Sequence, residues 1–255
     1  MKAVLLVAGR GKRLCNHTKI IPKSLLKVAN KPILFHIVDR ILANGIIEFV
    51  VVVGFKKEMI IDALKKKYPK IDFVFVENEI YDKTNTLYSL FITKDQIKED
   101  FLYFNADVMF NKNILKKLLN EKYKNGAVVE PHKESMEVFG FDGIITKISK
   151  KKDAVGKALG IYKFSKEAAK KLFEESEKII KSGNLNSYHS AGVNPTIVHH
   201  RMDLISTDGM SWIEVDEEED LLDAERVLAK IVKEEHNGKL RKRLSKNAGK
   251  LIPNT

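Results

Sequence analysis

The chain has 255 residues, of which 44% are hydrophobic, and its formal net charge is +11. This length allows one large domain with a well-filled core, and no apolar run approaches the roughly 20 residues of a membrane-spanning helix. A single cysteine excludes an internal disulfide framework and fits a reducing compartment, which we expect to be the cytoplasm. The lysines are spread along the chain and accompany no nucleic-acid-binding motif. We therefore attribute the charge to a solvated lysine surface around a phosphate-handling cleft, and expect no nucleic-acid partner.

In the first half of the chain, apolar runs alternate with helical patterns. We expect strands over residues 2–8, 46–53, 72–76 and 101–105, and helices over residues 32–43, 56–68, 84–91 and 111–123. The 46–53 run is continuous, β-branched and closed by a glycine, which is typical of a central parallel strand. This alternation predicts an α/β fold with a doubly wound, mostly parallel sheet.

The pattern changes after Gly126, where short strands separated by turns are expected. These strands cover residues 127–131, 143–148 and 158–164, and a helix over residues 165–182 follows, with Ser165 as its N-cap. A last strand over 211–215 precedes a closing helix over 217–235. We expect one domain over residues 1–235 and a basic tail over residues 236–255. The tail is expected to be solvated, with weak contact to an anionic membrane surface or a junction to a further domain as alternatives.

The first strand leads into a glycine-rich segment with three adjacent cations. Two glycines two residues apart let backbone N–H groups approach a phosphate, and the cations Arg10, Lys12 and Arg13 can neutralise a polyphosphate. The dinucleotide-binding fingerprint is excluded because Leu14 stands in place of its third glycine, and the P-loop is excluded because Arg13 replaces its serine or threonine. The segment predicts a phosphate-binding loop of another kind, with a simple glycine turn as the alternative.

Three blocks of sequence carry a specific resemblance. They are Leu5-Leu6-Val7-Ala8-Gly9-Arg10-Gly11-Lys12-Arg13-Leu14, Pro22-Lys23-Ser24-Leu25 and Lys31-Pro32-Ile33. Blocks and spacing resemble the sugar-phosphate nucleotidyltransferase family, whose pattern is L-A-A-G-x-G-x-R-L, then P-K, then K-P. Two later segments extend the resemblance: Leu102-Tyr103-Phe104-Asn105-Ala106-Asp107, and Trp212-Ile213-Glu214-Val215-Asp216 followed by Asp220-Leu221-Leu222-Asp223-Ala224. The resemblance reaches to about Lys233 and implies a Rossmann-like nucleotide-binding core with a small β-rich lobe on the acceptor side.

The resemblance also implies a role for each matched residue. Asp107 and Asp216 would bind Mg²⁺, a hard cation that suits two carboxylates from distant strand ends. Arg13 and Lys23 would be the catalytic cations: Arg13 would hold the leaving phosphates, and Lys23 would bridge the α-phosphate and the acceptor phosphate. The nucleotide-binding residues would be Leu6, Ala8, Gly9, Arg10, Gly11 and Lys12. The structural alternatives are a turn aspartate at 107 and a helix N-cap at 216.

One segment separates the branches of the family. Residues 81–90 resemble a stretch of the phosphocholine and inositol-1-phosphate cytidylyltransferases, whereas hexose-1-phosphate members usually place a glutamine there. This similarity implies CTP as the donor and Asn85 as a nucleotide ligand. Lys150 falls where the family has a lysine on the acceptor phosphate, and Glu130 is a further candidate for acceptor binding. Lys157 is a departure, because many members have a glutamate near this position.

These residues predict a Mg²⁺-dependent enzyme that joins CTP to a small phosphorylated alcohol and releases pyrophosphate. A composition rich in Lys, Glu and Ile is typical of heat-loving organisms, and members of the family in such organisms make the CDP derivative of inositol 1-phosphate. We therefore expect this acceptor, which would need polar ligands; candidates are Asn85, Glu130, His189 and Asn194. Phosphocholine is an alternative that needs an aromatic cage; candidates are Tyr81, Tyr88, Phe139, Tyr188 and Trp212. A hexose 1-phosphate acceptor and a non-catalytic, nucleotide-binding regulatory protein are further alternatives. The sequence is silent on oligomeric state.

Overall fold

The computed structural model of the protein describes residues 1–14, 18–131, 138–149 and 155–248. These residues form a nine-stranded sheet in the order β5-β4-β1-β6-β11-β8-β12-β10-β9. The first four strands in this order are parallel: β5 (Phe73–Glu77), β4 (Glu48–Val53), β1 (Lys2–Leu6) and β6 (Phe101–Asn105). The α/β class and the parallel nucleotide-binding half predicted from the sequence are confirmed.

The other half of the sheet is mixed and forms the β-rich lobe. It begins at β11 (Gly156–Phe164), which runs antiparallel to both β6 and β8 (Gly126–Pro131). The outer strands are β12 (Asp203–Ser206), β10 (Ile144–Ile148) and β9 (Val138–Phe141). Because β11 bonds directly to β6, the two halves are one continuous sheet. The prediction of a mostly parallel sheet therefore describes its first half only.

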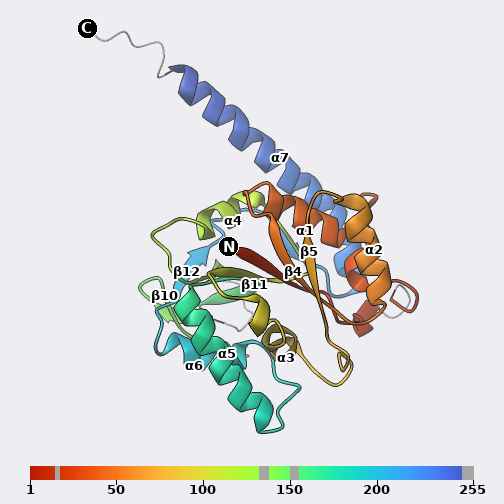
Figure 1. Ribbon diagram of the computed structural model, residues 1–255. Helices are drawn as coiled ribbons and strands as arrows, with labels where there is room; N and C mark the ends of the chain where they lie inside the picture. Colours follow the sequence, from red (N-terminus) through yellow and green to blue (C-terminus); the bar gives the residue numbers. More distant parts are fainter. Residues whose placement is uncertain (15–17, 132–137, 150–154, 249–255) are drawn as a thin grey trace.

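Helices cover both faces of the sheet (Figure 1). One face carries α1 (Ile33–Leu42), α2 (Lys57–Lys67), α4 (Lys112–Leu118) and α7 (Glu218–Ala248). The opposite face carries α3 (Thr86–Phe91), α5 (Lys166–Lys181) and α6 (Ser190–Ile197). Successive strand residues point to opposite faces; for example, Leu5 belongs to the core under α1 and Val4 to the core under α5.

Two further pairs of short strands form two-stranded ribbons that are separate from the main sheet. One pairs β13 (Trp212–Glu214) with β7 (Val108–Phe110), and the other pairs β2 (Lys27–Val28) with β3 (Lys31–Pro32). Leu6 and Asn105, the last residues of β1 and β6, are register partners at the same edge. Carboxyl ends of parallel strands are where open α/β sheets bind ligands. This edge is therefore the place to look for a site.

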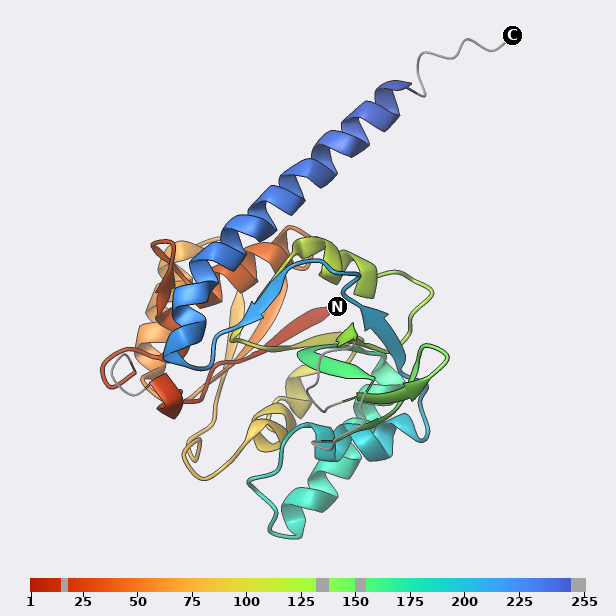
Figure 2. The same cartoon turned by 180° about the vertical axis from the view of Figure 1, so that it is seen from behind.

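Several element boundaries differ from those predicted. The helix expected over 111–123 ends at Leu118, and the closing helix expected to end at Glu235 continues to Ala248, away from the body of the molecule (Figures 1 and 2). Lysine, arginine and leucine are strong helix formers, which explains this extension. Ser165 is the N-cap of α5 as predicted, because its Oγ accepts a hydrogen bond from Ala168 N. Among the described residues, no helix is both long and apolar enough to span a bilayer.

Candidate active site

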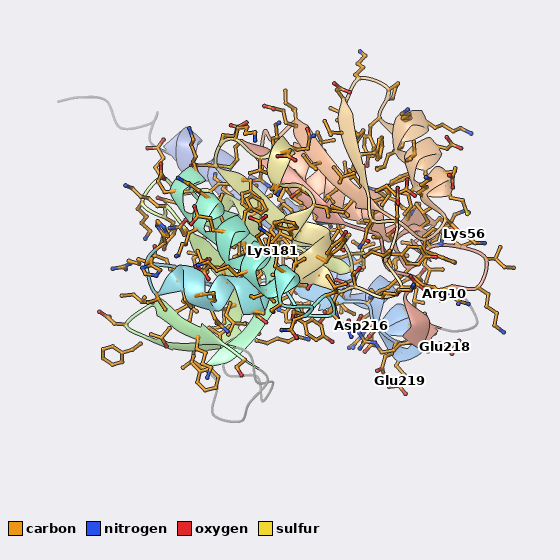
Figure 3. The ribbon with its side chains drawn as sticks, turned by 60° about the horizontal axis from the view of Figure 1, so that its bottom comes forward. Arg10, Lys56, Lys181, Asp216, Glu218 and Glu219 are labelled. Carbon is orange, nitrogen blue, oxygen red and sulfur yellow. The ribbon has the colours of Figure 1, made fainter. Side chains whose placement is uncertain are left out.

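A cleft of about 810 Å³ lies at the carboxyl ends of β1 and β6. Ligand pockets of this size hold small organic molecules. Most of the site residues predicted from the sequence line it: Leu6, Ala8, Gly9, Arg10, Gly11, Arg13, Lys23, Asn85, Asp107 and Asp216. Figure 3 shows Arg10 and Asp216 on the same side of the molecule, although more than two hundred residues separate them in sequence. The fold thus brings the dispersed motifs into one cavity.

Gly11 shapes the floor of this cleft. It adopts the left-handed conformation with a φ of 72°, and a Cβ at this position would lie only 2.7 Å from the Cβ of Lys23. The carbonyl of Gly11 also accepts a hydrogen bond from Thr18 Oγ1 at 3.0 Å. Only glycine satisfies both the backbone conformation and the close contact. The loop after β1 therefore sets the position of Lys23 as well as presenting backbone N–H groups.

We expect Gly11→Ala to destabilise the protein more than Gly45→Ala and to lower turnover as well. Gly45 has a similar φ of 83° but nothing within 4 Å of its Cβ position, so its alanine variant should lose only the left-handed strain, about 1–2 kcal/mol. Gly11→Ala must in addition displace Lys23. Denaturant unfolding and steady-state kinetics measure the two effects. Equal losses of stability with unchanged kcat in both variants would contradict the role given to Gly11.

Two aspartates meet at the cleft because of the β13–β7 ribbon. Asp107 stands between β6 and β7, and Asp216 follows β13; Val215 N donates a hydrogen bond to the Asp107 carbonyl at 2.9 Å. Asp107, Glu214 and Asp216 each offer a carboxylate oxygen, and these three oxygens lie within 4.8 Å of one another. The non-local pairing of β13 with β7 thus concentrates negative charge at one point.

Two cations contact the two aspartates of this cluster. Lys23 Nζ lies 2.9 Å from Asp107 Oδ2 and 2.6 Å from Asp216 Oδ1, and an Arg13 guanidinium nitrogen lies 2.9 Å from Asp216 Oδ2. Burial would lower the pKa of Lys23, but the two carboxylates outweigh it and raise that pKa. Burial would likewise raise the pKa of Asp216, but Lys23 and Arg13 hold it below its usual value. Lys23 and Asp216 are therefore both charged at neutral pH.

The aspartates fit Mg²⁺. Asp107 Oδ1 is buried and has no hydrogen-bond partner within the described part of the chain, so a hard cation would satisfy it. Asp216 is not used as a helix cap: Asp220 Oδ2 accepts hydrogen bonds from the backbone N–H groups of Asp216 and Glu217, both at 2.8 Å. The Asp216 carboxylate is thereby left to face Lys23, Arg13 and the cleft.

Residues 2–230 match the family model described as nucleotidyl transferase. The chain belongs to the nucleotidyl transferase family. The membership predicted from the sequence motifs is confirmed.

One curated relative and two solved structures are also similar to the chain. The chain is 32% identical over 221 residues to the bifunctional protein GlmU of Methanococcus maripaludis, an alignment that covers 78% of this chain and 52% of GlmU. The chain therefore spans about half the length of the curated relatives it matches first. The inositol-1-phosphate CTP transferase of T. maritima has a similar fold, with a TM-score of 0.78 at 20% identity over 90% of this chain and 95% of that one. The CTP:phosphocholine cytidylyltransferase LicC of Streptococcus pneumoniae gives a TM-score of 0.75 at 27% identity, over 89% and 98%.

Glu214 is a member of the carboxylate cluster that the sequence motifs did not single out. It lines the cleft, and its pKa is raised by burial and by the nearby Asp107 carboxylate. Lys157 Nζ donates a hydrogen bond to Glu214 Oε2 at 2.6 Å and opposes this increase. Its place in the Trp212–Asp216 segment, two residues before Asp216, is the signal that could have identified it.

The other predicted site residues either form hydrogen bonds with protein groups or lie outside the described residues. Asn85 lines the cleft, but its Oδ1 caps α3 by accepting from Thr86 N, and its Nδ2 donates to Asn186 Oδ1 at 3.3 Å. Glu130 is not among the described residues lining the cleft, because its Oε2 accepts hydrogen bonds from Trp212 Nε1 and Thr207 Oγ1. The side chain of Lys12 and all of Lys150 lie outside the described residues.

The candidates for acceptor binding separate into two groups. His189 lines the cleft, where its ring nitrogens lie 3.2 Å from Thr86 Oγ1 and 3.1 Å from Tyr162 Oη; burial lowers its pKa to about 4, so it is neutral at pH 7. Asn194 instead hydrogen-bonds both backbone groups of Ile148 and serves the fold. Of the five aromatic residues considered for a choline cage, only Tyr81 and Tyr188 line the cleft in the described chain.

Proposed function

We propose that the protein is a Mg²⁺-dependent cytidylyltransferase that transfers the CMP group of CTP to a small phosphorylated alcohol and releases pyrophosphate. One observation carries the proposal: Lys23 lies between Asp107 and Asp216 within a cleft large enough for both substrates. The likeness to two CTP-using enzymes supports CTP as the donor. The presence of Arg13, Lys23 and both aspartates disfavours a non-catalytic regulatory protein.

In this reaction a phosphate oxygen of the acceptor forms a bond to the α-phosphorus of CTP, and the bond from that phosphorus to the bridging oxygen breaks. The attacking oxygen is already anionic, so the reaction needs positioning and charge neutralisation more than a base. Mg²⁺ held by Asp107 and Asp216 would supply positive charge to the reacting phosphates. Lys23 would move its ammonium between the α-phosphate and the acceptor phosphate, and Arg13 would bind the leaving β- and γ-phosphates.

The two substrates would enter from different sides of the carboxylates. We assign the nucleotide to the loop after β1, through Leu6, Ala8, Gly9, Arg10, Gly11 and Lys12, and to Asn85 at the start of α3. The acceptor would lie toward the mixed half of the sheet, with Lys150 on its phosphate. Glu130 would act on the acceptor indirectly, because its carboxylate fixes the indole of Trp212.

Inositol 1-phosphate is the acceptor that we propose. Neutral polar side chains line the cleft, among them Thr84, Thr86 and Asn186, and such groups suit the hydroxyl groups that a polyol supplies in number. Phosphocholine remains the second candidate because the 27% identical LicC acts on it. Its quaternary ammonium group would need aromatic faces, and Phe55, Tyr81 and Tyr188 line the cleft.

A panel of substrates tests this proposal. With Mg²⁺ present, we expect CTP to have a higher kcat/KM than UTP, dTTP, ATP or GTP, and inositol 1-phosphate to exceed phosphocholine and glucose 1-phosphate. Release of pyrophosphate and formation of the CDP-alcohol are both measured, with reactions lacking acceptor as the control.

Each result has a distinct consequence. Strong preference for another donor would disprove the CTP assignment but leave the family intact. A tenfold or greater preference for phosphocholine, equal to about 1.4 kcal/mol of transition-state discrimination, would replace the polyol assignment by the choline one. A preference for glucose 1-phosphate would favour the hexose-1-phosphate alternative. No turnover with any pair would disprove the enzymatic proposal.

We further propose a cytoplasmic location and a domain over residues 1–235. The basic segment 236–255 would be solvated or in weak contact with an anionic membrane surface; its first part, to Ala248, continues α7. We also propose that nucleic acid is not a partner of this protein.

A further inference from the structure

An ion pair stands on the acceptor side of the carboxylate cluster. Lys157 comes from β11 and Glu214 from β13, and Lys157 Nζ lies 2.6 Å from Glu214 Oε2. The same ammonium lies 5.6 Å from the centroid of the Trp212 ring. Both side chains are about one-quarter exposed, at 25% and 24%, so the pair is only partly screened by water. Of the two, Glu214 lines the cleft and Lys157 is not among the described lining residues, so the lysine acts on the cleft through Glu214.

The cations around the cluster are divided among its members. Lys23 contacts Asp107 and Asp216, and Arg13 contacts Asp216. Lys157 contacts the third carboxylate, Glu214. Lys157 is the register partner of Glu130 in the β11–β8 pair, so it belongs to the mixed half of the sheet. The ion-pair partner of Glu214 thus comes from the mixed half of the sheet, where we place the acceptor. The ion-pair partners of the two aspartates come from the segment that follows β1.

Glu214 is close to the place where an acceptor would react. One of its oxygens lies within 4.8 Å of oxygens of Asp107 and Asp216, and its side chain lines the cleft. An acceptor whose phosphate reaches Lys23 and the aspartates places the first atoms of its alcohol within a few bond lengths of that phosphate. Those atoms come within Coulomb range of Glu214 and Lys157.

We propose that Lys157, acting through Glu214, selects the charge class of the acceptor: it admits neutral polyol phosphates and disfavours acceptors with a quaternary ammonium group. This inference rests on the proposed function and deepens it. A carboxylate paired with lysine keeps lone pairs that accept hydrogen bonds from hydroxyl groups. It presents little net negative charge, and a trimethylammonium group has no N–H to donate to it. Lys157 is a positioning residue that acts on the acceptor through the charge of Glu214.

Acceptor competition in three variants tests the proposal. Lys157→Met removes the positive charge and keeps much of the aliphatic chain, Lys157→Arg keeps the charge, and Lys117→Met removes an ion pair with Asp208 that lies outside the residues lining the cleft. The measurement is kcat/KM for phosphocholine and for inositol 1-phosphate at saturating CTP and Mg²⁺. We expect Lys157→Met to raise the ratio of phosphocholine to inositol 1-phosphate at least tenfold, mainly through KM. Lys157→Arg and Lys117→Met should leave the ratio within about twofold of the wild-type value.

Glu214→Gln should change the acceptor ratio in the opposite direction. It also keeps the proposal testable if the Lys157→Met variant does not fold. It removes the carboxylate and leaves the lysine charge, so the same ratio should fall below that of the wild type. A ratio unchanged in both Lys157→Met and Glu214→Gln, with native circular dichroism, would overturn the charge selection.

Failure of the proposed function gives a different pattern. If the wild-type protein turns over neither acceptor, binding of phosphocholine and of inositol 1-phosphate to the CTP-loaded protein, measured by calorimetry, still reports the selection. A tenfold rise in the affinity for phosphocholine relative to inositol 1-phosphate on Lys157→Met would support the selection. The same affinity ratio in the wild type and in Lys157→Met would refute it.

Discussion

Asp107→Ala and Asp216→Ala are each expected to lower kcat by roughly 10²–10³-fold or more, with the fold retained. Each substitution removes one of the two carboxylates that fit Mg²⁺ and one of the two ion-pair partners of Lys23. The reacting phosphates then repel each other with less positive charge between them. Steady-state kinetics across a Mg²⁺ titration measure the loss, and circular dichroism checks the fold.

Asp208→Ala is the matched control for these variants. Asp208 pairs with Lys117 at the surface, at 60% side-chain exposure, and does not line the cleft. Its loss should change kcat by less than about twofold, because surface ion pairs contribute little. Normal Mg²⁺-dependent turnover in both Asp107→Ala and Asp216→Ala would eliminate this metal site.

Lys23→Ala should also lower kcat by about 10²-fold or more, with a smaller change in the KM for the acceptor. The repulsion between the two phosphates grows as they approach, so a cation between them stabilises the transition state more than the bound substrates. Lys150→Ala should mainly raise the KM for the acceptor, because Lys150 would meet only the acceptor phosphate, whose charge is similar before and during attack. The measurement is kinetics with the acceptor varied at saturating CTP.

Lys57→Ala is the control for loss of a lysine elsewhere. Lys57 forms a surface ion pair with Glu77 on α2 and β5, outside the residues that line the cleft, and should leave kcat and KM unchanged. A larger loss of kcat in Lys150→Ala than in Lys23→Ala would reverse the two roles.

Several residues that the sequence singled out come together in one cleft of the structure. Two local signals sufficed: a glycine-rich segment after the first strand, and aspartates placed after later strands. The carboxyl end of β6 explains why Asp107 lies at the ligand-binding edge, whereas Asp216 reaches it through the antiparallel β13–β7 pair; the structure brings both within hydrogen-bond distance of Lys23.

Glu214 and Lys157 could not be paired from the sequence. Their contact depends on the register of β13 against β7 and of β11 against β8, which are pairings between segments distant in sequence. Local patterns carry no information on such registers. Glu130 shows the same difficulty: its carboxylate was expected to face the acceptor, whereas the structure places it under Trp212.

Elements of the mixed half were also harder to predict. The sequence analysis did not identify β9, β12 or α6. The first two are four-residue strands, and α6 contains Gly192 and Pro195, which are usually signs of a turn. Tertiary packing overrides these signs, since Val193 and Thr196 of α6 are fully buried.

The continuous sheet limits how the protein can move during catalysis. β6, which ends next to Asp107, bonds directly to β11, and Gly160 of β11 packs so closely on Asn105 that an added Cβ would lie 2.4 Å from its amide nitrogen. Hinge closure occurs where few bonds join two bodies, and here a ladder of backbone hydrogen bonds joins them. In the proposed reaction, strand registry would preset the alignment of the two phosphates, and adaptation to a new acceptor would fall to loops and side chains. Residues of the mixed half could then be exchanged to change the alcohol that is used without re-engineering the nucleotide site.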